Sequence, residues 1–306
     1  MRALKVMLEY FHPWPNSAGF YLARERGWYR EVGLEVELVV HDPYHGDTLE
    51  YLARGAVEFG VFPSNRLLVR RARGEALLGV AAINHAGLES IQTLADSGIR
   101  RPRDLQGKRL ALNPTPRGLA MVCHLVASDG GDPDAVQLVD SGVRELRPEE
   151  LAAGAADASF GGYWAWEALL PSAIADERRV VLPVDSLGAP PYHSYLLGAR
   201  EGWLEEHGEL TRRFLAATAR GFLAAAADPE AALPAYERTI PYFPREMLRQ
   251  SLQRIAPTWL HQGRWGEQRQ ARLEPYAQWL HAHGVLDDAQ AWRQATRNDW
   301  LPEAGQ

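Results

Sequence analysis

Apolar and polar residues alternate along the first hundred positions in a pattern that predicts strands and helices in turn. Residues 4–8 form an apolar run typical of a buried strand, and residues 17–28 carry apolar side chains at helical spacing. Further strands are predicted at 34–40, 57–62 and 77–83, with helices at 44–54 and 65–73. This order predicts a parallel sheet wrapped by helices, in which the loops at the carboxyl ends of the strands are available for a ligand.

The same alternation starts again near residue 98 and indicates a second α/β unit that ends near residue 185. Its strands are expected at 109–112, 136–139 and 156–160, and its helices at 115–128 and 148–153. Beyond residue 200 the pattern is helical almost throughout, with helices expected at 209–227, 229–239, 245–255, 267–283 and 288–296.

We therefore expect an α/β fold with two lobes and a helical C-terminal segment. One lobe is discontinuous and comprises residues 1–97 and 186–306, and the other comprises residues 98–185. Two such lobes suggest a clamshell that holds its ligand between them.

Residues at the predicted helix ends support this organisation. Ser17 is expected to cap the first helix with its side chain, and Gly33 to end that helical segment in the left-handed conformation. Thr115 is expected to cap the helix whose first position is Pro116.

Composition narrows the function classes. The 306 residues carry 33 basic and 39 acidic side chains, a net charge of −6, which argues against a nucleic-acid partner and against an anionic membrane surface. No apolar stretch reaches the length of about 18 residues that a transmembrane helix needs. The first residues lack the pattern of a signal peptide, so we expect either a cytoplasmic protein or an extracytoplasmic one whose leader was removed.

Metal and enzyme signatures are missing from the sequence. Cys123 is the only cysteine, which excludes an intramolecular disulfide and a cysteine-based metal site, and we expect it to be a small buried hydrophobe. We find no G-x-S-x-G, H-E-x-x-H or G-x-G-x-x-G motif. His281 and His283 are expected on the surface, and His41 and His45 lack a neighbouring acidic cluster. No catalytic residue, metal or cofactor is predicted.

Aromatic residues are in surplus, and some of them follow predicted strands. The chain has ten tryptophans and eleven tyrosines, which hints at a stacking site for a flat ligand. Residues 9–16 combine Glu9, Tyr10, Trp14 and Asn16 with two prolines that stiffen the loop and would lower the entropy cost of presenting Trp14. The alternative is local packing against the edge of the sheet.

A second cluster covers residues 161–167. Two glycines allow a sharp turn at the end of a strand, and Tyr163, Trp164 and Trp166 follow. Glu167, four residues after Tyr163 on a first helical turn, is expected to share a face with it. A ring beside a carboxylate suits a planar, nitrogen-rich heterocycle. The alternative is that these aromatics fill a core between the lobes.

Other candidate ligand-binding residues lie near predicted strand ends and helix starts. Asn113 and Thr115 precede a helix whose free N–H groups, with Arg117, would favour an anionic or carbonyl group, although an ordinary helix cap explains them as well. Ser64 follows the third strand. Tyr192, in a proline-rich segment, could line the cleft or belong to a plain hinge.

Several segments together resemble a known family. The chain is similar to the NMT1/THI5-like branch of ABC-transporter solute-binding proteins, which bind thiamine pyrimidine precursors. Residues 17–36 and 102–108 resemble segments that are general to the type II binding-protein fold. The Tyr-Trp-x-Trp-Glu segment at 162–167 and the Asn-Asp-Trp-Leu-Pro segment at 296–302 point to pyrimidine-binding members. The matching segments are residues 17–36, 55–61, 102–108, 162–167 and 296–302.

The resemblance implies a two-lobe, periplasmic-binding-protein-like clamshell that captures formylaminopyrimidine or a hydroxymethylpyrimidine-like heterocycle for uptake by an ABC permease and ATPase. It also implies that Tyr163 and Trp164 stack on the ring and that Glu167 reads it. The eukaryotic synthases of this family have a histidine that donates its own ring and a cysteine-rich iron-binding run, and the single Cys123 leaves this chain without that run. The alternative function is a cytoplasmic enzyme or sensor that acts on a pyrimidine-like metabolite.

Overall fold

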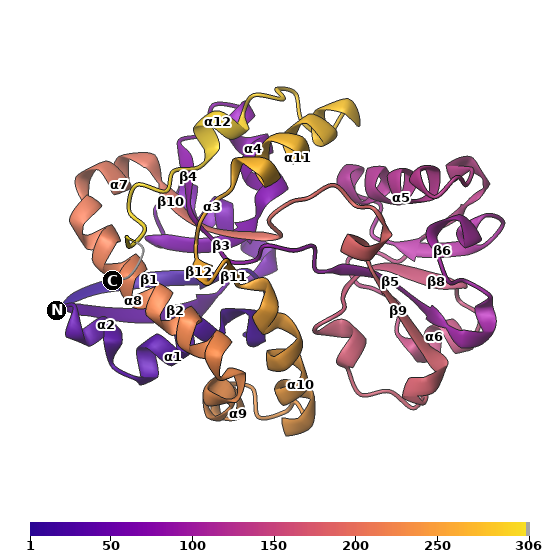
Figure 1. The fold of residues 1–306 in the computed structure, drawn as a ribbon, viewed down its shortest axis with the longest axis horizontal. Helices are drawn as coiled ribbons and strands as arrows, with labels where there is room; N and C mark the ends of the chain where they lie inside the picture. The colour runs from indigo at the N-terminus through magenta and orange to yellow at the C-terminus, as the bar shows by residue number, and fades with distance from the viewer. Residues whose placement is uncertain (304–306) are drawn as a thin grey trace. The chain divides into compact units, whose positions relative to one another are not determined.

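The computed structural model describes residues 1–303 and divides the chain into two α/β units (Figure 1). Unit 1 comprises Met1–Ala86, Tyr192–Ala282 and the described residues from Leu286 onward, and unit 2 comprises Gly87–Pro191 with His283–Val285. Each unit has one five-stranded sheet with helices around it, and unit 1 also has a two-stranded hairpin. The two α/β halves predicted from the alternation are thus confirmed.

The sheet of unit 1 is mixed, not purely parallel as the sequence predicted. Strand β1 pairs in parallel with β2 and β3, whereas β10 runs antiparallel between β3 and β4. Strand β10 could not be predicted, because its short apolar run carries no period that separates a strand from a buried helix. In sheet order the strands are β2 (Leu34–Val40), β1 (Arg2–Leu8), β3 (Phe59–Pro63), β10 (Tyr195–Arg200) and β4 (Leu77–Ala82).

One edge of this sheet gathers polar residues from distant parts of the chain. Strands β1, β3 and β4 end at this edge and β10 begins there, because β10 is antiparallel to both of its neighbours. Glu9, Ser64 and Asn84 follow the three ending strands, and His193 lies shortly before β10. The fold of unit 1 therefore brings these four side chains to one end of the sheet.

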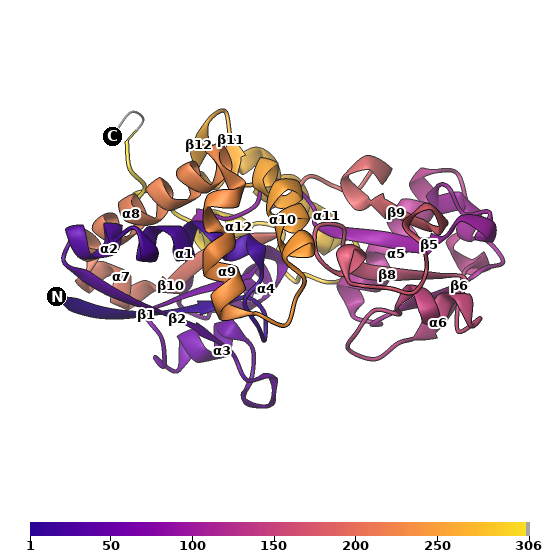
Figure 2. The same ribbon diagram turned by 90° about the horizontal axis from the view of Figure 1, so that it is seen from below.

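Helices cover both faces of the unit 1 sheet. Figure 2 shows α1, α2 and α8 on one side of β1 and β2, and α3 on the other. The helices of this unit are α1 (Ala18–Glu25), α2 (Trp28–Glu31), α3 (Thr48–Ala53), α4 (Ser64–Ala72), α7 (Glu201–Glu206), α8 (Gly208–Ala227), α9 (Leu233–Thr239), α10 (Arg245–Ile255), α11 (Gln270–Ala282) and α12 (Trp292–Ala295).

The helical tail is confirmed in its main elements and corrected at its end. Helices α8 and α10 match the predicted ranges closely, but the helix expected at 288–296 is reduced to the four residues of α12. A hairpin of β11 (Leu260–His261) and β12 (Arg264–Trp265) was not predicted. The hairpin follows η10 (Ala256–Thr258), a short 3-10 helix whose last residue, Thr258, belongs to the polar edge of unit 1.

Helices α1 and α8 cross at two glycines. A methyl group at Gly221 would lie 2.0 Å from the carbonyl oxygen of Gly19, and one at Gly19 would lie 2.2 Å from the ring of Phe222. Neither glycine has a positive φ, so the requirement is for space and not for a special backbone conformation. The close approach is possible only because both residues lack a side chain.

We expect Gly221→Ala to lower the free energy of unfolding by about 1–3 kcal/mol, because the new methyl group forces α8 away from α1. Urea unfolding measures this change. Gly202→Ala is the matched control, since Gly202 lies on α7 with no atom within 4 Å of the added methyl group, and it should leave stability unchanged or raise it. Equal unfolding midpoints for the two variants would contradict the close crossing.

Unit 2 repeats the architecture and the strand-pairing pattern of unit 1, with three parallel strands followed by one antiparallel strand and an edge strand. Strands β5 and β9 were not predicted, and both run antiparallel to their neighbours, so this sheet is also mixed. Helices α5 (Pro116–Ser128) and α6 (Pro148–Ala152) flank the sheet (Figure 1). In sheet order the strands are β7 (Gln137–Asp140), β6 (Arg109–Leu112), β8 (Ala158–Tyr163), β5 (Glu89–Leu94) and β9 (Arg179–Pro183).

The predicted helix ends have mixed outcomes. Thr115 caps α5 as expected, with its hydroxyl accepting from the N–H of Gly118 at 3.1 Å, and Gly33 has a φ of 77°. Ser17 makes no side-chain cap; its hydroxyl donates to the carbonyl of Trp14 at 2.8 Å instead. Cys123 is exposed on α5, which corrects the expectation of a buried thiol.

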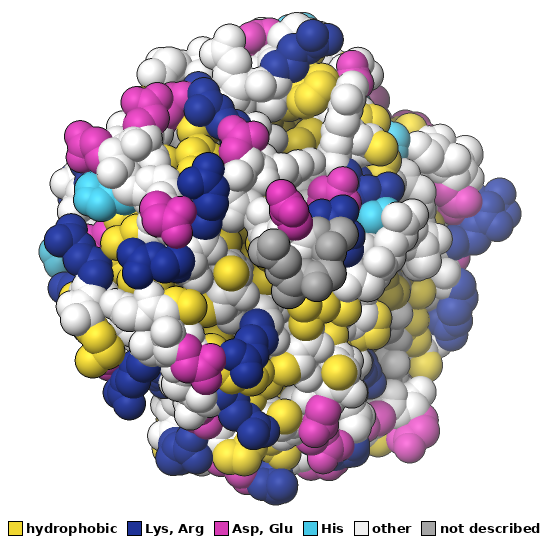
Figure 3. Space-filling view, turned by 60° about the vertical axis from the view of Figure 1, so that its left-hand side comes forward, with side chains coloured by type: hydrophobic (Ala, Val, Ile, Leu, Met, Phe, Trp, Pro, Cys, Tyr) yellow, Lys and Arg dark blue, Asp and Glu magenta, His cyan; other side chains and the backbone are white. Residues whose placement is uncertain are grey.

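The surface of the described residues carries charges of both signs. Figure 3 shows Lys and Arg side chains interspersed with Asp and Glu over one face, with hydrophobic side chains between them. This face therefore has no broad basic area. Within residues 1–303, no helix combines the length and the apolar character needed to cross a membrane.

Candidate functional site

A buried polar network lies at the polar edge of unit 1. The Asn16 carboxamide donates to Glu9 Oε1 at 2.9 Å, and its own oxygen accepts from Asn84 Nδ2 at 2.8 Å and from the indole N–H of Trp259 at 3.2 Å. Asn84 Nδ2 also donates to the hydroxyl of Thr258 at 2.8 Å. All five residues are buried, and Asn16 is 1% exposed. The network therefore joins the loop after β1, the end of β4 and the helical tail.

The chemistry of the partners sets the direction of this network. An indole N–H can only donate, so the oxygen of Asn16 must face Trp259, and its NH₂ group must face Glu9. Glu9 Oε1 is consequently an acceptor. Thr258 donates its own proton to the carbonyl of Ile255 at 2.8 Å, which leaves a lone pair for Asn84. The Asn16 carboxamide thus has one orientation, whereas Glu9 Oε2 and Asn84 Oδ1 are buried without a hydrogen-bond partner among residues 1–303.

Burial changes the acidity of Glu9. Loss of hydration raises the pKa of its carboxyl, although hydrogen bonds from Asn16, from its own backbone and from Trp14 favour the charged form. With Oε1 turned toward Asn16, the oxygen that can take up a proton is Oε2. Glu9 is therefore easier to protonate than an exposed glutamate.

The loop of residues 9–16 contains two kinds of aromatic residue. Trp14 is 1% exposed, so the loop buries this ring and does not present it. Tyr10 instead stacks on Phe11 with ring centroids 4.5 Å apart, and His12 meets both rings edge-on. Phe11 is 55% exposed. The accessible aromatic surface of this loop is therefore formed by residues 10–12, of which the sequence analysis singled out only Tyr10.

Histidines extend the polar edge next to Asn84. The Nε2 atom of His193 accepts from the backbone N–H of Arg269 at 3.1 Å, so the other ring nitrogen must carry the proton that it shares with the Asn84 carbonyl at 3.0 Å. Ser64 donates to the carbonyl of His193. His85 is 6% exposed, and its ring nitrogens have no hydrogen-bond partner among residues 1–303. Ser64 thus supports the backbone of this edge.

In unit 2 the predicted aromatic and carboxylate residues lie together, but not on a helix. Tyr163 is the last residue of β8, and the carboxylate of Glu167 accepts from the backbone N–H of Tyr163 at 2.8 Å. The first helical turn, a 3-10 turn, begins only at Glu167. The Trp164 indole donates to the carbonyl of Gly87 at 3.0 Å, which fixes its ring. The expected shared helical face is wrong, and a tight turn closed by Glu167 replaces it.

The two glycines before Tyr163 serve an irregular strand and not a turn at its end. Gly161 has a φ of 123°, and the register between β5 and β8 shifts at this level. A methyl group at Gly162 would lie 2.5 Å from the amide of Gln92 and 3.2 Å from Cβ of Glu167. Glu145 approaches the same segment, and burial raises the pKa of its carboxyl. Sequence reasoning missed Glu145, which no local motif marks.

The remaining aromatic candidates divide between packing and partial exposure. Trp166 is 1% exposed and is therefore a packing residue. Tyr192 is buried in unit 1 and stacks on Tyr276 with centroids 4.7 Å apart. Tyr163 and Trp164 are partly exposed.

The start of α5 is an ordinary capped helix with an added ion pair. Asn113 and Thr115 are exposed, and Thr115 makes the cap described above. Arg117, expected to attract an anion, forms an ion pair with Glu89. Its positive charge is therefore compensated within unit 2. Across residues 1–303, no group of three or more His, Cys, Asp or Glu side chains is placed to hold a metal ion.

Comparison with known proteins adds three findings. A family model described as NMT1/THI5 like matches residues 14–232. The chain is 27% identical over 235 residues to a formylaminopyrimidine-binding protein of Halalkalibacterium halodurans, covering 76% of this chain and 69% of that protein. It is also 25% identical over 268 residues to a 4-amino-5-hydroxymethyl-2-methylpyrimidine phosphate synthase of Aspergillus parasiticus, covering 79% and 77%.

Among solved structures, the periplasmic aliphatic sulphonate binding protein SsuA of Escherichia coli superposes with a TM-score of 0.72 at 18% identity, covering 96% of this chain and 97% of that one. This similarity confirms the predicted periplasmic-binding-protein-like fold. The family model spans well over half of the sequence, and the resemblance predicted from the sequence is confirmed. The chain belongs to the NMT1/THI5-like family.

Proposed function

We propose that this protein binds a thiamine pyrimidine precursor, formylaminopyrimidine or a hydroxymethylpyrimidine-like heterocycle, and delivers it to an ABC-type uptake system. The observation that carries the proposal is the turn in unit 2 where Glu167 lies beside Tyr163 and Trp164. The similarity to the formylaminopyrimidine-binding protein of Halalkalibacterium halodurans supports the same ligand class.

The geometry of this turn suits an aminopyrimidine. A carboxylate has about four lone-pair positions, so Glu167 can accept from an amino group of the ligand as well as from the N–H of Tyr163. The bond to Tyr163 also fixes the carboxylate before the ligand arrives, which lowers the entropy cost of binding. Partly exposed aromatic rings next to it supply a surface on which a flat ring stacks.

Unit 1 supplies a second set of ligand-binding candidates. Glu9, held by Asn16, offers a carboxyl group whose protonation state can adapt to the ligand. Tyr10 belongs to the accessible aromatic surface of the same loop. The remaining candidates in the two units, Trp14, Ser64, Asn113, Thr115 and Tyr192, act in this proposal as supports for these segments.

Location and partners follow from the proposed role. A binding protein that serves uptake works outside the cytoplasm with a permease and an ATPase, and the structurally similar SsuA of Escherichia coli is a periplasmic binding protein. Co-purification of this chain with a candidate ABC permease, in the presence of the pyrimidine, is the corresponding experiment.

Calorimetric titration with formylaminopyrimidine and hydroxymethylpyrimidine tests the proposed ligand. We expect Glu167→Gln to weaken binding by roughly 10- to 100-fold, because a charged hydrogen bond worth about 1.5–3 kcal/mol is replaced by an amide whose NH₂ group opposes the ligand's amino group. The glutamine oxygen can still accept from Tyr163, so the turn should keep its shape.

Glu177→Gln makes the same chemical change at an exposed glutamate of unit 2 and should bind like the unaltered protein. Near-ultraviolet circular dichroism shows whether each variant keeps its fold. If neither pyrimidine produces heat or a shift in melting temperature, the proposal is wrong. Equal affinities of the two variants would remove Glu167 from the site.

An enzyme is the second candidate, because the Aspergillus parasiticus relative is named as a synthase. In that case Glu167 would act as acid or base on a pyrimidine-like metabolite. Mass spectrometry of the bound pyrimidine after long incubation separates the two functions: conversion that stops in Glu167→Gln favours the enzyme, and an unchanged ligand favours the binding protein.

A further inference from the structure

A pocket of about 440 Å³ opens in unit 1 at the edge of the sheet opposite Glu9 and Asn84. Its floor includes Leu77, the first residue of β4, whereas Asn84 follows the other end of that strand. A strand rises about 3.3 Å per residue, so the two places are on the order of 20 Å apart along β4. The pocket is therefore separate from the polar edge. Its volume falls in the range of small-molecule sites.

The pocket contains a half-buried arginine that forms no ion pair with a described acid. The guanidinium of Arg200, the last residue of β10, makes no hydrogen bond and no ion pair with any of residues 1–303. The neighbouring acids have other partners: Glu75 binds Arg70 at 2.7 Å, and Glu201 binds Arg71 at 2.9 Å. A guanidinium has five N–H donors, and leaving them unpaired away from bulk water costs free energy.

Gly55 provides the surface against which the Arg200 guanidinium packs. The position of a missing Cβ at Gly55 lies 3.2 Å from three guanidinium atoms of Arg200, so the flat group packs over the glycine. Gly55 has a φ of 74°, a conformation that favours glycine. Packing of this kind occupies the face of the guanidinium and leaves its edge for a planar partner.

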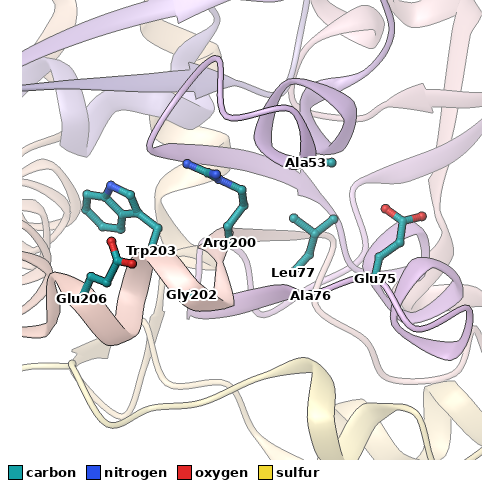
Figure 4. A pocket seen from close by; sticks show the side chains of 8 residues that line it. All are labelled: Ala53, Glu75, Ala76, Leu77, Arg200, Gly202, Trp203 and Glu206. Atoms are coloured by element: carbon teal, nitrogen blue, oxygen red, sulfur yellow. The ribbon is translucent and has the colours of Figure 1, made fainter.

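An aromatic ring stands next to this cation. Figure 4 shows Arg200 extended between Trp203 and Ala53, with Leu77 beside it. The Trp203 indole is supported by His207, on which it stacks with centroids 4.7 Å apart, and by the edge of Phe59 at 5.0 Å. These contacts hold the indole in place while the residue stays partly exposed. A rigid indole and a fixed guanidinium are the two components of a site for an aromatic acid.

We propose that this pocket is a second binding site, and that it takes a small monocarboxylate with a flat apolar body. The carboxylate pairs with the guanidinium edge of Arg200 through two parallel hydrogen bonds, and the ring of the ligand packs against Trp203 and Leu77. The exposed carboxylate of Glu206 lines the same pocket, so a second negative charge on the ligand is repelled. The site does not depend on pyrimidine binding in unit 2.

Benzoate is the probe, with benzamide as its neutral analogue and phthalate as a dianion. Binding is followed on the full chain by the ¹H–¹⁵N signal of the Trp203 indole, assigned from Trp203→Phe. We expect benzoate to shift this signal in a saturable manner, and benzamide and phthalate to bind at least tenfold more weakly. Arg200→Gln should reduce benzoate affinity at least tenfold.

Arg73→Gln is the matched control, because Arg73 is an exposed arginine of the same unit, and it should leave benzoate binding unchanged. Equal binding of benzoate and benzamide, or equal affinity of the Arg200 and Arg73 variants, overturns the proposal. A loss of stability in Arg200→Gln without saturable benzoate binding to the unaltered protein also overturns it and makes Arg200 a structural residue. Formylaminopyrimidine should not compete with benzoate, so this result stands apart from the proposed function.

Discussion

Replacing Asn16 by leucine is expected to lower the free energy of unfolding by about 3–5 kcal/mol. The substitution keeps the number and branching of the side-chain heavy atoms, although leucine is larger than asparagine. It removes three hydrogen bonds at once, those to Glu9, Asn84 and Trp259. Each partner is buried, and a buried donor or acceptor that loses its partner costs about 1–3 kcal/mol. Asn84 keeps its bond to Thr258, which limits the total. Urea unfolding at neutral pH gives the value.

Asn16→Asp is the sharper variant, because it has nearly the same shape and loses only the donor toward Glu9. One aspartate oxygen still accepts from Trp259 and Asn84, while the other faces Glu9 Oε1. Two carboxyl groups at this distance share a proton. The folded state then binds more protons than the unfolded state above about pH 4, where free carboxyls ionise, so stability must fall as pH rises.

The two variants therefore differ in their dependence on pH. Compared with the unaltered protein at the same pH, Asn16→Leu should be destabilised throughout, whereas the deficit of Asn16→Asp should shrink as the solution is acidified toward pH 5. Parallel pH profiles for the two variants would mean that Asn16 does not donate to Glu9. A loss below 1 kcal/mol in Asn16→Leu would mean that water replaces the network.

The strands after which the polar edge forms could be predicted because each is a short apolar run with clear breaks. The predicted third and fourth strands end next to Ser64 and Asn84, and carboxyl ends of parallel strands meet at one edge. Asn84 could have been found by the same rule that singled out Glu9. Asn84 has no Phe, Tyr or Trp neighbour in the sequence, and therefore lacks the signal that marks the loop of residues 9–16.

Partners far away in sequence could not be predicted. Trp259 donates to a residue 243 positions earlier, and helical periodicity indicates only that it packs. Trp14 was expected to face a ligand because it lies between two prolines that stiffen the loop, but tertiary packing buries its ring. Periodicity and turn signals are local, whereas both outcomes depend on which distant segments come together.

The cluster at residues 161–167 of unit 2 was predicted only in part. The composition of residues 161–167 identified a ring and a carboxylate that do lie together, as the bond from Tyr163 to Glu167 shows. Their predicted arrangement was wrong, because β8 continues through Tyr163 and the helical turn starts later. The irregular register between β8 and β5 sets this arrangement. Register depends on both paired strands, and β5 was not predicted.

Acidification from pH 6 to pH 5 is expected to remove about 2–3 kcal/mol of stability through His85 and His193 alone. Burial lowers the pKa of His85 to about 3, with Arg272, His261 and Arg269 acting in the same direction. Burial, followed by the neighbouring His85, lowers the pKa of His193 to about 3, against the bond to the Asn84 carbonyl. The two rings are 5.0 Å apart, so a charge on one opposes a charge on the other.

The sign follows from proton binding in the two states. An unfolded histidine takes up a proton below about pH 6.5, whereas the folded ring stays neutral down to about pH 3, so the unfolded state binds more protons in this window. Stability is therefore fully present above pH 6.5 and is lost at about 1.4 kcal/mol per pH unit for each histidine as pH falls. The raised pKa of Glu9 acts with the opposite sign, so the histidine contribution must be taken as a difference between proteins.

Unfolding free energies of the unaltered protein, His85→Leu, His193→Gln and the double variant between pH 7 and pH 4.5 give that difference. Leucine can replace His85 because the ring nitrogens of His85 have no hydrogen-bond partner among residues 1–303. Glutamine can replace His193 because its carboxamide keeps a donor for the Asn84 carbonyl and an acceptor for the N–H of Arg269. Each single variant should flatten the acid slope by about 1.4 kcal/mol per pH unit, and the double variant by about twice that. If the double variant loses stability as steeply as the unaltered protein, the two rings must be accepting protons in the folded state. The polar edge of unit 1 would then tolerate positive charge beside Asn84.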